Sequence, residues 1–134
     1  MDIASINFLA VLVAAISSFV IGSLWYSPIL FGKVWQREIK LSDKELQNSN
    51  MVKIFGLSFI LSLIIAFNLA AFIGSASTLA FGLFAGAAAG IGWVATALGI
   101  LFLFEKKSFK LWLIDAGYHA VTFTIMGAIL GVWH

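Results

Sequence analysis

The sequence contains four long apolar runs. They cover approximately residues 3–25, 54–73, 79–104 and 111–133, and polar stretches separate them. Each run is about as long as, or longer than, the roughly 20 helical residues that cross the hydrocarbon core of a bilayer. None alternates polar and apolar residues as a barrel strand does, and backbone groups in lipid must be bonded within their own segment. The pattern therefore predicts an all-helical membrane protein with four transmembrane helices.

The polar stretch after the first run contains a second, shorter pattern. At 100° per residue its apolar and basic side chains fall on opposite sides of a helix: Phe31, Val34, Trp35 and Ile39 against Lys33, Arg37, Lys40 and Lys44. This predicts a basic amphipathic helix lying flat at the membrane surface within residues 29–50, with its cations toward anionic headgroups. The alternative is a loop whose lysines only set the topology. Ser42 and Glu45 fit a capping box, which predicts a further helix from Asp43 into the second run.

Composition agrees with lipid as the surrounding solvent. Of 134 residues, 62% are hydrophobic and 10% are charged, far from the make-up of soluble domains. The length indicates a single integral membrane domain, residues 1–134. Because the chain has no cysteine, disulfides and thiolate metal sites are excluded.

The basic residues predict the orientation. All eight lie in two connections, the one between the first and second runs and the one between the third and fourth. With four spans both connections lie on one face, and the positive-inside rule makes that face cytoplasmic. We therefore expect both termini and the short turn at 74–78 to lie outside. Since topology accounts for the cations, nucleic-acid binding has no support.

The segment "LWYSPILFGKVW", residues 24–35, lies where the first run meets these charges. Trp25, Tyr26 and Trp35 are typical of an aromatic belt at the headgroup level. Pro28 disfavours helical geometry at the residue before it, so it predicts an end or a sharp bend of the first helix. Together with Lys33 and Arg37, these residues form a predicted interfacial anchor.

Three parts of the chain resemble a known family. They are the segment just described, the glycine-rich third run with Trp93, and the fourth run with its stretch "DAGYHAVTFTIMGAILGVW". Together they resemble domain-of-unknown-function family seventeen-sixty-one, short four-helix integral membrane proteins of bacteria. The resemblance implies a membrane protein of unassigned function in the inner membrane of a bacterium, and it supplies no catalytic or binding residues.

Asp115 and His119 are the ionisable pair inside the fourth run. They lie four residues apart and share a helical face with Thr122. An ionisable residue inside a span usually faces protein or water, because exposure to hydrocarbon is costly. The pair therefore fits a structural role, with hydrogen bonds to neighbouring helices, or a polar path for protons or a small cation. One histidine and one carboxylate are too few ligands for a zinc site, and we expect neither a metal nor a cofactor.

Small residues recur at four-residue spacing on two runs. Gly82, Gly86 and Gly90 lie on the third run, and Gly127 and Gly131 on the fourth. Such spacing lets helix backbones approach closely in lipid. It predicts helix packing within one protomer, between protomers, or both.

Asn7 and Asn68 each lie about a turn from the outer edge of a predicted span. We expect buried hydrogen bonds between them, or from one of them to the Trp93 indole, because free polar groups are costly in hydrocarbon.

The residues do not indicate an enzyme. The spans contain no Ser/His/Asp set at a common depth, and no paired carboxylates lie close in sequence. The sequence therefore predicts a non-catalytic, homo-oligomeric helical bundle whose partners are membrane lipid and its own copies. The alternative is a small transporter or channel for protons or a small cation that uses Asp115 and His119.

Overall fold

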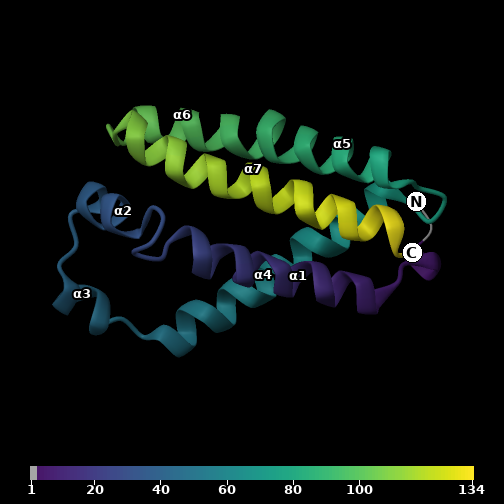
Figure 1. Cartoon of the computed structure of the whole chain (residues 1–134), viewed down its shortest axis with the longest axis horizontal. Coiled ribbons are helices and arrows are strands. Elements are labelled where there is room, and N and C mark those ends of the chain that lie inside the picture. Colours follow the sequence, from purple (N-terminus) through teal and green to yellow (C-terminus); the bar gives the residue numbers. More distant parts are fainter. Residues whose placement is uncertain (1–2) are drawn as a thin grey trace.

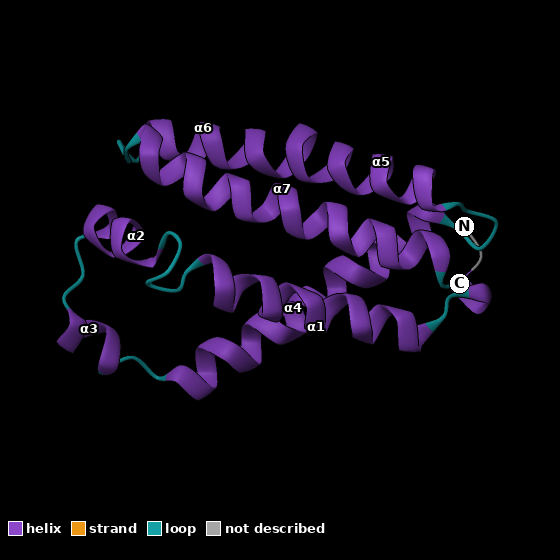
Figure 2. Cartoon of the chain, in the orientation of Figure 1, coloured by secondary structure: helices purple, strands orange, loops and turns teal. Residues whose placement is uncertain are grey.

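The computed structural model describes residues 3–134, and this part of the chain is helical without strands (Figure 2). A 3-10 turn, Ile3–Ser5, comes first, and a π-helical turn, Gly90–Ala95, joins α5 to α6. The α-helices are α1 (Phe8–Trp25), α2 (Gly32–Ile39), α3 (Asp43–Gln47), α4 (Met51–Ile73), α5 (Leu79–Ala89), α6 (Thr96–Phe104) and α7 (Phe109–Val132).

Four helical runs are long and apolar enough to cross a membrane: α1, α4, the continuous run from α5 to α6, and α7. This confirms the predicted count of spans and makes the chain a multi-pass membrane protein. The predicted starts differ by a few residues because polar side chains cap the helices. The Asn7 side-chain oxygen Oδ1 accepts from the Leu9 and Ala10 N–H groups, so α1 starts at Phe8 and not at residue 3. Caps by Asn50 and Ser108 likewise start α4 and α7.

Between α1 and α4 the chain forms two short helices. The Ser42 hydroxyl accepts from the Glu45 N–H at 3.1 Å and donates to the Glu45 carboxylate, so the predicted cap is present. The helix that follows does not continue into the second span: α3 ends at Gln47, and a new helix starts after Asn50. Within the segment predicted to form an amphipathic helix lies α2, and its Trp35 ring packs edge-on against Tyr26.

The helices form a bundle with two ends (Figure 1). The α5–α6 run and α7 lie antiparallel and side by side, α1 packs on α7, and α4 crosses α1 obliquely. The N- and C-termini lie close together at one end, next to the connection between α4 and α5. At the opposite end lie α2, α3 and the turn between α6 and α7. All eight basic residues belong to this second end.

The closest helix contact joins α5 to α7 through glycine. A Cβ atom at Gly82 would collide with the Gly127 carbonyl oxygen, and one at Gly127 would collide with the Gly82 carbonyl oxygen. A Cβ at Gly86 would collide with the Phe123 carbonyl oxygen. Gly90 and Gly131 face the same contact, because their Cβ atoms would lie 2.8 Å from Phe123 Cβ and 2.6 Å from the Thr78 carbonyl oxygen. The five glycines singled out in the sequence therefore pack within one protomer.

The core on the other side of α7 is built from small and flexible side chains. Ala10 and Ala14 of α1 and Ala66 of α4 are fully buried, which lets these helices cross closely. Met126 and Leu130 of α7 fill the space beside them. This apolar core occupies the half of the bundle nearer the termini.

The glycine contact makes a testable prediction. Gly86→Ala places a methyl group against the Phe123 backbone, which cannot move as a flexible side chain can. We expect it to lower the free energy of unfolding in mild detergent by about 1–3 kcal/mol or more. The measurement is the thermal unfolding midpoint of the purified protein.

The matched controls are Gly92→Ala and Gly56→Ala, since a Cβ at either position meets no atom within 4 Å. They should leave the midpoint unchanged or raise it slightly, because alanine reduces the freedom of the unfolded chain. Equal midpoints for Gly86→Ala and the controls would contradict the packing described here.

Candidate functional site

Polar and aromatic side chains gather where α1 meets α7 near the basic end of the bundle. We call this cluster the α1–α7 clasp. Its members on α1 and just after it are Ser18, Gly22, Trp25 and Tyr26, and its members on α7 are Ile114, Asp115, Gly117 and Tyr118. Each helix contributes an aromatic donor, and each contributes a glycine on which the other helix's ring rests.

Trp25 reaches from α1 to the backbone of α7. Its indole N–H donates to the Ile114 carbonyl oxygen at 2.9 Å. The ring lies against Gly117, where a Cβ would come within 3.0 Å of it. The missing side chain at Gly117 therefore gives the indole access to a carbonyl one turn earlier in α7.

Tyr118 reaches in the opposite direction. Its hydroxyl donates to the Ser18 carbonyl oxygen at 2.8 Å and lies against Gly22, where a Cβ would be 3.3 Å from the hydroxyl oxygen. The Ser18 hydroxyl donates to the Ala15 carbonyl oxygen and lies 3.2 Å from the Ser62 hydroxyl. These contacts extend the polar cluster from α7 through α1 to α4.

Tyr26 supplies the bond to the carboxylate. Its hydroxyl donates to Asp115 Oδ1 at 2.8 Å, and its ring packs against Tyr118 with 5.5 Å between ring centroids. Burial, and then the neighbouring Asp115 carboxylate, raise the pKa of the Tyr26 phenol. The phenol therefore stays protonated and remains the donor.

The sequence after Tyr26 folds the chain back over this cluster. Pro28 follows the end of α1, and the Gly32 N–H donates to the Ser27 carbonyl oxygen at 2.9 Å. A Cβ at Gly32 would collide with the Tyr26 carbonyl oxygen, so a side chain does not fit in this turn. The tight turn brings Trp35 of α2 onto Tyr26.

The predicted polar pair is only partly assembled. Asp115 bonds to Tyr26, and no hydrogen bond joins it to His119 among residues 3–134. The His119 ring lies edge-on to Tyr118 and Phe123, at centroid distances of 5.1 and 6.2 Å. Thr122 is 2% exposed, and its hydroxyl has no hydrogen-bond partner within the described chain.

Residues 9–131 match the profile of a family described as "Protein of unknown function (DUF1761)". The chain belongs to this family. Comparison with curated proteins and with solved structures gave no match. Two of the three segments behind the resemblance meet in the clasp, since Trp25 and Tyr26 contact the Gly117–Tyr118 pair in this DUF1761 protein.

The predicted anchor residues divide into two groups in the DUF1761 chain. Trp25 and Tyr26 turn their polar atoms toward α7 and not toward the surroundings. Trp35 is half-buried, whereas Pro28, Lys33 and Arg37 are exposed.

The expected buried polar contacts of Asn7, Asn68 and Trp93 are not formed. Asn7 caps α1, and the Asn68 amide N–H donates back to the Ile64 carbonyl oxygen at 2.8 Å. Asn68 is exposed, and Trp93 is 67% exposed. The physical reason is that α4 and α5 diverge from the connection that joins them. Asn68 of α4 therefore faces outward.

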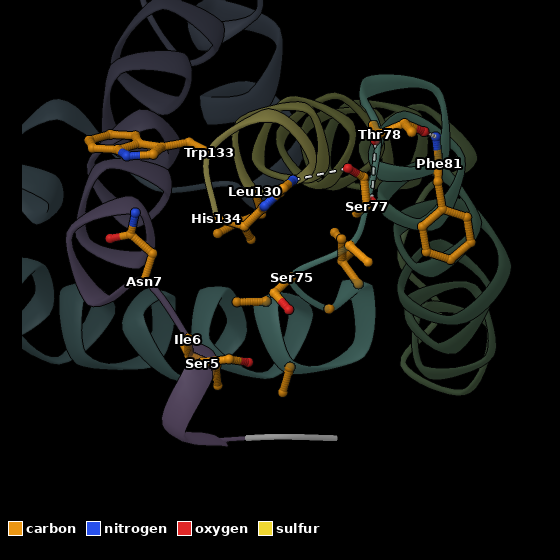
Figure 3. Close-up of a pocket in the computed structure, with 15 residues that line it drawn as sticks. Ser5, Ile6, Asn7, Ser75, Ser77, Thr78, Phe81, Leu130, Trp133 and His134 are labelled. Atoms are coloured by element: carbon orange, nitrogen blue, oxygen red, sulfur yellow. Dashed lines mark hydrogen bonds between the residues drawn. The ribbon is translucent and has the colours of Figure 1, made fainter.

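A hollow of about 450 Å³ opens at the terminal end of the bundle (Figure 3). Its lining includes Asn7, Ser75, Ser77 and His134, and among residues 3–134 no acidic side chain, lysine or arginine lines it. The His134 ring bonds to the Ser77 carbonyl oxygen at 2.9 Å. The described lining therefore offers hydroxyl, amide and imidazole groups. Among residues 3–134, no group of three or more His, Cys, Asp or Glu side chains is placed to hold a metal ion.

Five members of the clasp were not predicted from the sequence: Ser18, Gly22, Ile114, Gly117 and Tyr118. The sequence does contain a signal for them. On each of two helices, a glycine lies within one turn of an aromatic hydrogen-bond donor. Trp112 repeats the contact without this signal, since its indole lies against Gly99 of α6 and donates to the Ala95 carbonyl oxygen at 2.9 Å.

The bond between Tyr26 and Asp115 can be measured by a double-mutant cycle. Tyr26→Phe and Asp115→Ala each remove one partner, and we expect a coupling energy of about 0.6–2 kcal/mol between them. The measurement is the free energy of unfolding of both single variants and the double variant in mild detergent. Ser23→Ala, which removes an exposed hydroxyl bonded to its own helix, should change little. Additive effects of the two changes would refute the bond.

Proposed function

We propose that this DUF1761 protein is a non-catalytic membrane protein that assembles as a homo-oligomer in the inner membrane of a bacterium. The observation that carries the proposal is a pair of polar side chains left on the outer surface of the spans. They are Asn68 of α4 and Trp93 of the π-helical turn.

Both side chains have unused hydrogen-bonding capacity. No residue of the described chain donates to Asn68 Oδ1 or accepts from Trp93 Nε1. Trp93 lies near the middle of the span Leu79–Phe104, far from the headgroup level that tryptophan prefers. Unpartnered polar groups in hydrocarbon are costly, so these positions favour contact with protein.

The two side chains line one apolar groove between α4 and α5. The groove has a volume of about 670 Å³, and its floor includes Phe123 of α7. Phe72 packs edge-on against Trp93, with 6.3 Å between ring centroids. Only 11% of the most apolar stretch of α4 is buried within the protomer, so this helix is available for contact with another chain.

A second copy of this chain fits the groove by its hydrogen-bonding chemistry. Asn68 offers an acceptor and Trp93 a donor on the same face. In a two-fold arrangement each surface meets its own copy, so each Asn68 accepts from the partner's Trp93 and both groups are satisfied. Lipid tails offer neither a donor nor an acceptor, which favours the second copy as the occupant.

The orientation proposed for this assembly follows from the charges. All eight basic residues belong to the end of the bundle that carries α2 and the turn between α6 and α7. The positive-inside rule supports a cytoplasmic location for that end and places the two termini outside.

The oligomer is tested by removing the two outward groups. Asn68→Leu and Trp93→Phe each delete two symmetric hydrogen bonds, worth about 0.6–1.7 kcal/mol apiece. We expect the dissociation constant in mild detergent to rise about tenfold or more for each variant. The measurement is light scattering over a range of protein-to-detergent ratios.

The double variant should dissociate no more readily than the single variants, because both changes remove the same bonds. Val20→Ala, on the exposed surface of α1, should leave assembly unchanged. A wild-type protein that stays monomeric at every concentration would rule out the assembly.

Transport of protons or a small cation through Asp115 and His119 is a second candidate, and one observation favours it. The Thr122 hydroxyl is buried one turn beyond the clasp and has no hydrogen-bond partner among residues 3–134. The clasp brings polar groups from the basic end to this depth. Beyond it the core holds Met126, Leu130 and alanines, so a path within one protomer lacks polar groups in its other half.

Flux measurements distinguish the two candidates. We expect liposomes containing the protein and a pH-sensitive dye to take up protons no faster than empty liposomes under an imposed gradient. Proton flux in wild type that is lost in the Asp115→Asn, His119→Ala double variant would favour transport over the non-catalytic proposal.

A further inference from the structure

Three cations of α2 and its end lie on one stripe that faces away from the bundle. Lys33, Arg37 and Lys40 are spaced four and three residues apart, which places them on the same side of the helix, and all three are exposed. Within residues 3–134, no carboxylate lies within 4.0 Å of them, and the one ion pair joins Lys107 to Glu105. Their positive charge is therefore left without a partner.

The opposite side of α2 is fixed to the bundle. Trp35 packs against Tyr26 with 5.4 Å between ring centroids, and the Glu38 carboxylate accepts from the Ser108 hydroxyl at the start of α7. These contacts hold the stripe in one position. A fixed cluster of cations costs less entropy to bind an anion than three lysines on a mobile loop do.

The stripe borders a hollow of about 520 Å³ between α2 and the start of α3. Glu45 is the acidic residue of this hollow, and it accepts from Ser42. The Asp43 carboxylate accepts a hydrogen bond from the Gln36 amide and therefore points toward Gln36. Three cations against one carboxylate leave a net positive site with room for a phosphate group.

We propose that this hollow binds the phosphate of an anionic phospholipid. Arginine and lysine are the side chains that bind phosphate oxygens, arginine through two parallel N–H groups. Only a short loop separates α2, which carries the cations, from the end of α1. The site therefore lies at the level of the headgroups. Leu41, which lines the hollow and is exposed, gives an acyl chain an apolar contact. The site shares no residue with the groove between α4 and α5, so its test does not depend on oligomer formation.

The test is retention of lipid by the purified full-length protein. The protein is incubated in mixed micelles holding equal amounts of dioleoyl phosphatidylglycerol and dioleoyl phosphatidylcholine, and bound lipid is counted by native mass spectrometry. We expect one phosphatidylglycerol bound in preference to phosphatidylcholine, with a loss of about fivefold for each cation replaced by glutamine. Arg37→Lys should lose less than Arg37→Gln, because it keeps the charge but not the two parallel donors.

The matched control removes the same charge at the other basic connection, with Lys106, Lys107 and Lys110 changed to glutamine. It should keep the preference that the Lys33, Arg37 and Lys40 triple variant loses. Equal retention of the two lipids by wild type, or equal losses in both triple variants, would overturn the proposal. So would full displacement by millimolar inorganic phosphate, which would indicate a soluble anion as the ligand.

Discussion

The backbone contact between α5 and α7 determines where the other helices lie. Between helices in lipid, close packing and hydrogen bonds replace the hydrophobic effect as the source of association. Gly82 and Gly127 leave no side chain between the two backbones, so each carbonyl oxygen approaches the opposite helix directly. With one face of α7 held in this way, its remaining faces form the surface on which α1, α2 and part of α4 pack.

A second kind of contact recurs on that foundation. Trp25, Tyr118 and Trp112 each lie on a glycine of a neighbouring helix and donate to a carbonyl oxygen three or four residues before that glycine. The missing Cβ exposes the carbonyl, and the aromatic ring fills the space. One residue pair thus supplies both packing and a hydrogen bond. This explains why glycines and aromatic donors gather at the ends of α1 and α7.

The spans could be predicted from the sequence because their length and apolarity are local properties. The glycine spacing likewise predicted close approach, but not that α5 and α7 would be the partners, since spacing describes one helix at a time. Asn68 shows the limit most clearly. Its depth along α4 could be estimated, but its direction depends on the oblique crossing of α4 over α1. The π-helical turn that carries Trp93 also has no signature in the hydrophobic pattern.

The positions of satisfied and unsatisfied polar groups separate the inside of the bundle from its outside. In the clasp, the side chains of Trp25, Tyr26 and Tyr118 all have partners. The groups without partners are mostly on outward surfaces: Asn68 and Trp93 in the groove, and the cations of α2 at the basic end. A carrier would instead need exchangeable polar groups along both halves of its interior. The interior here is closed by backbone contacts, and this arrangement favours a protein whose interactions take place on its surface.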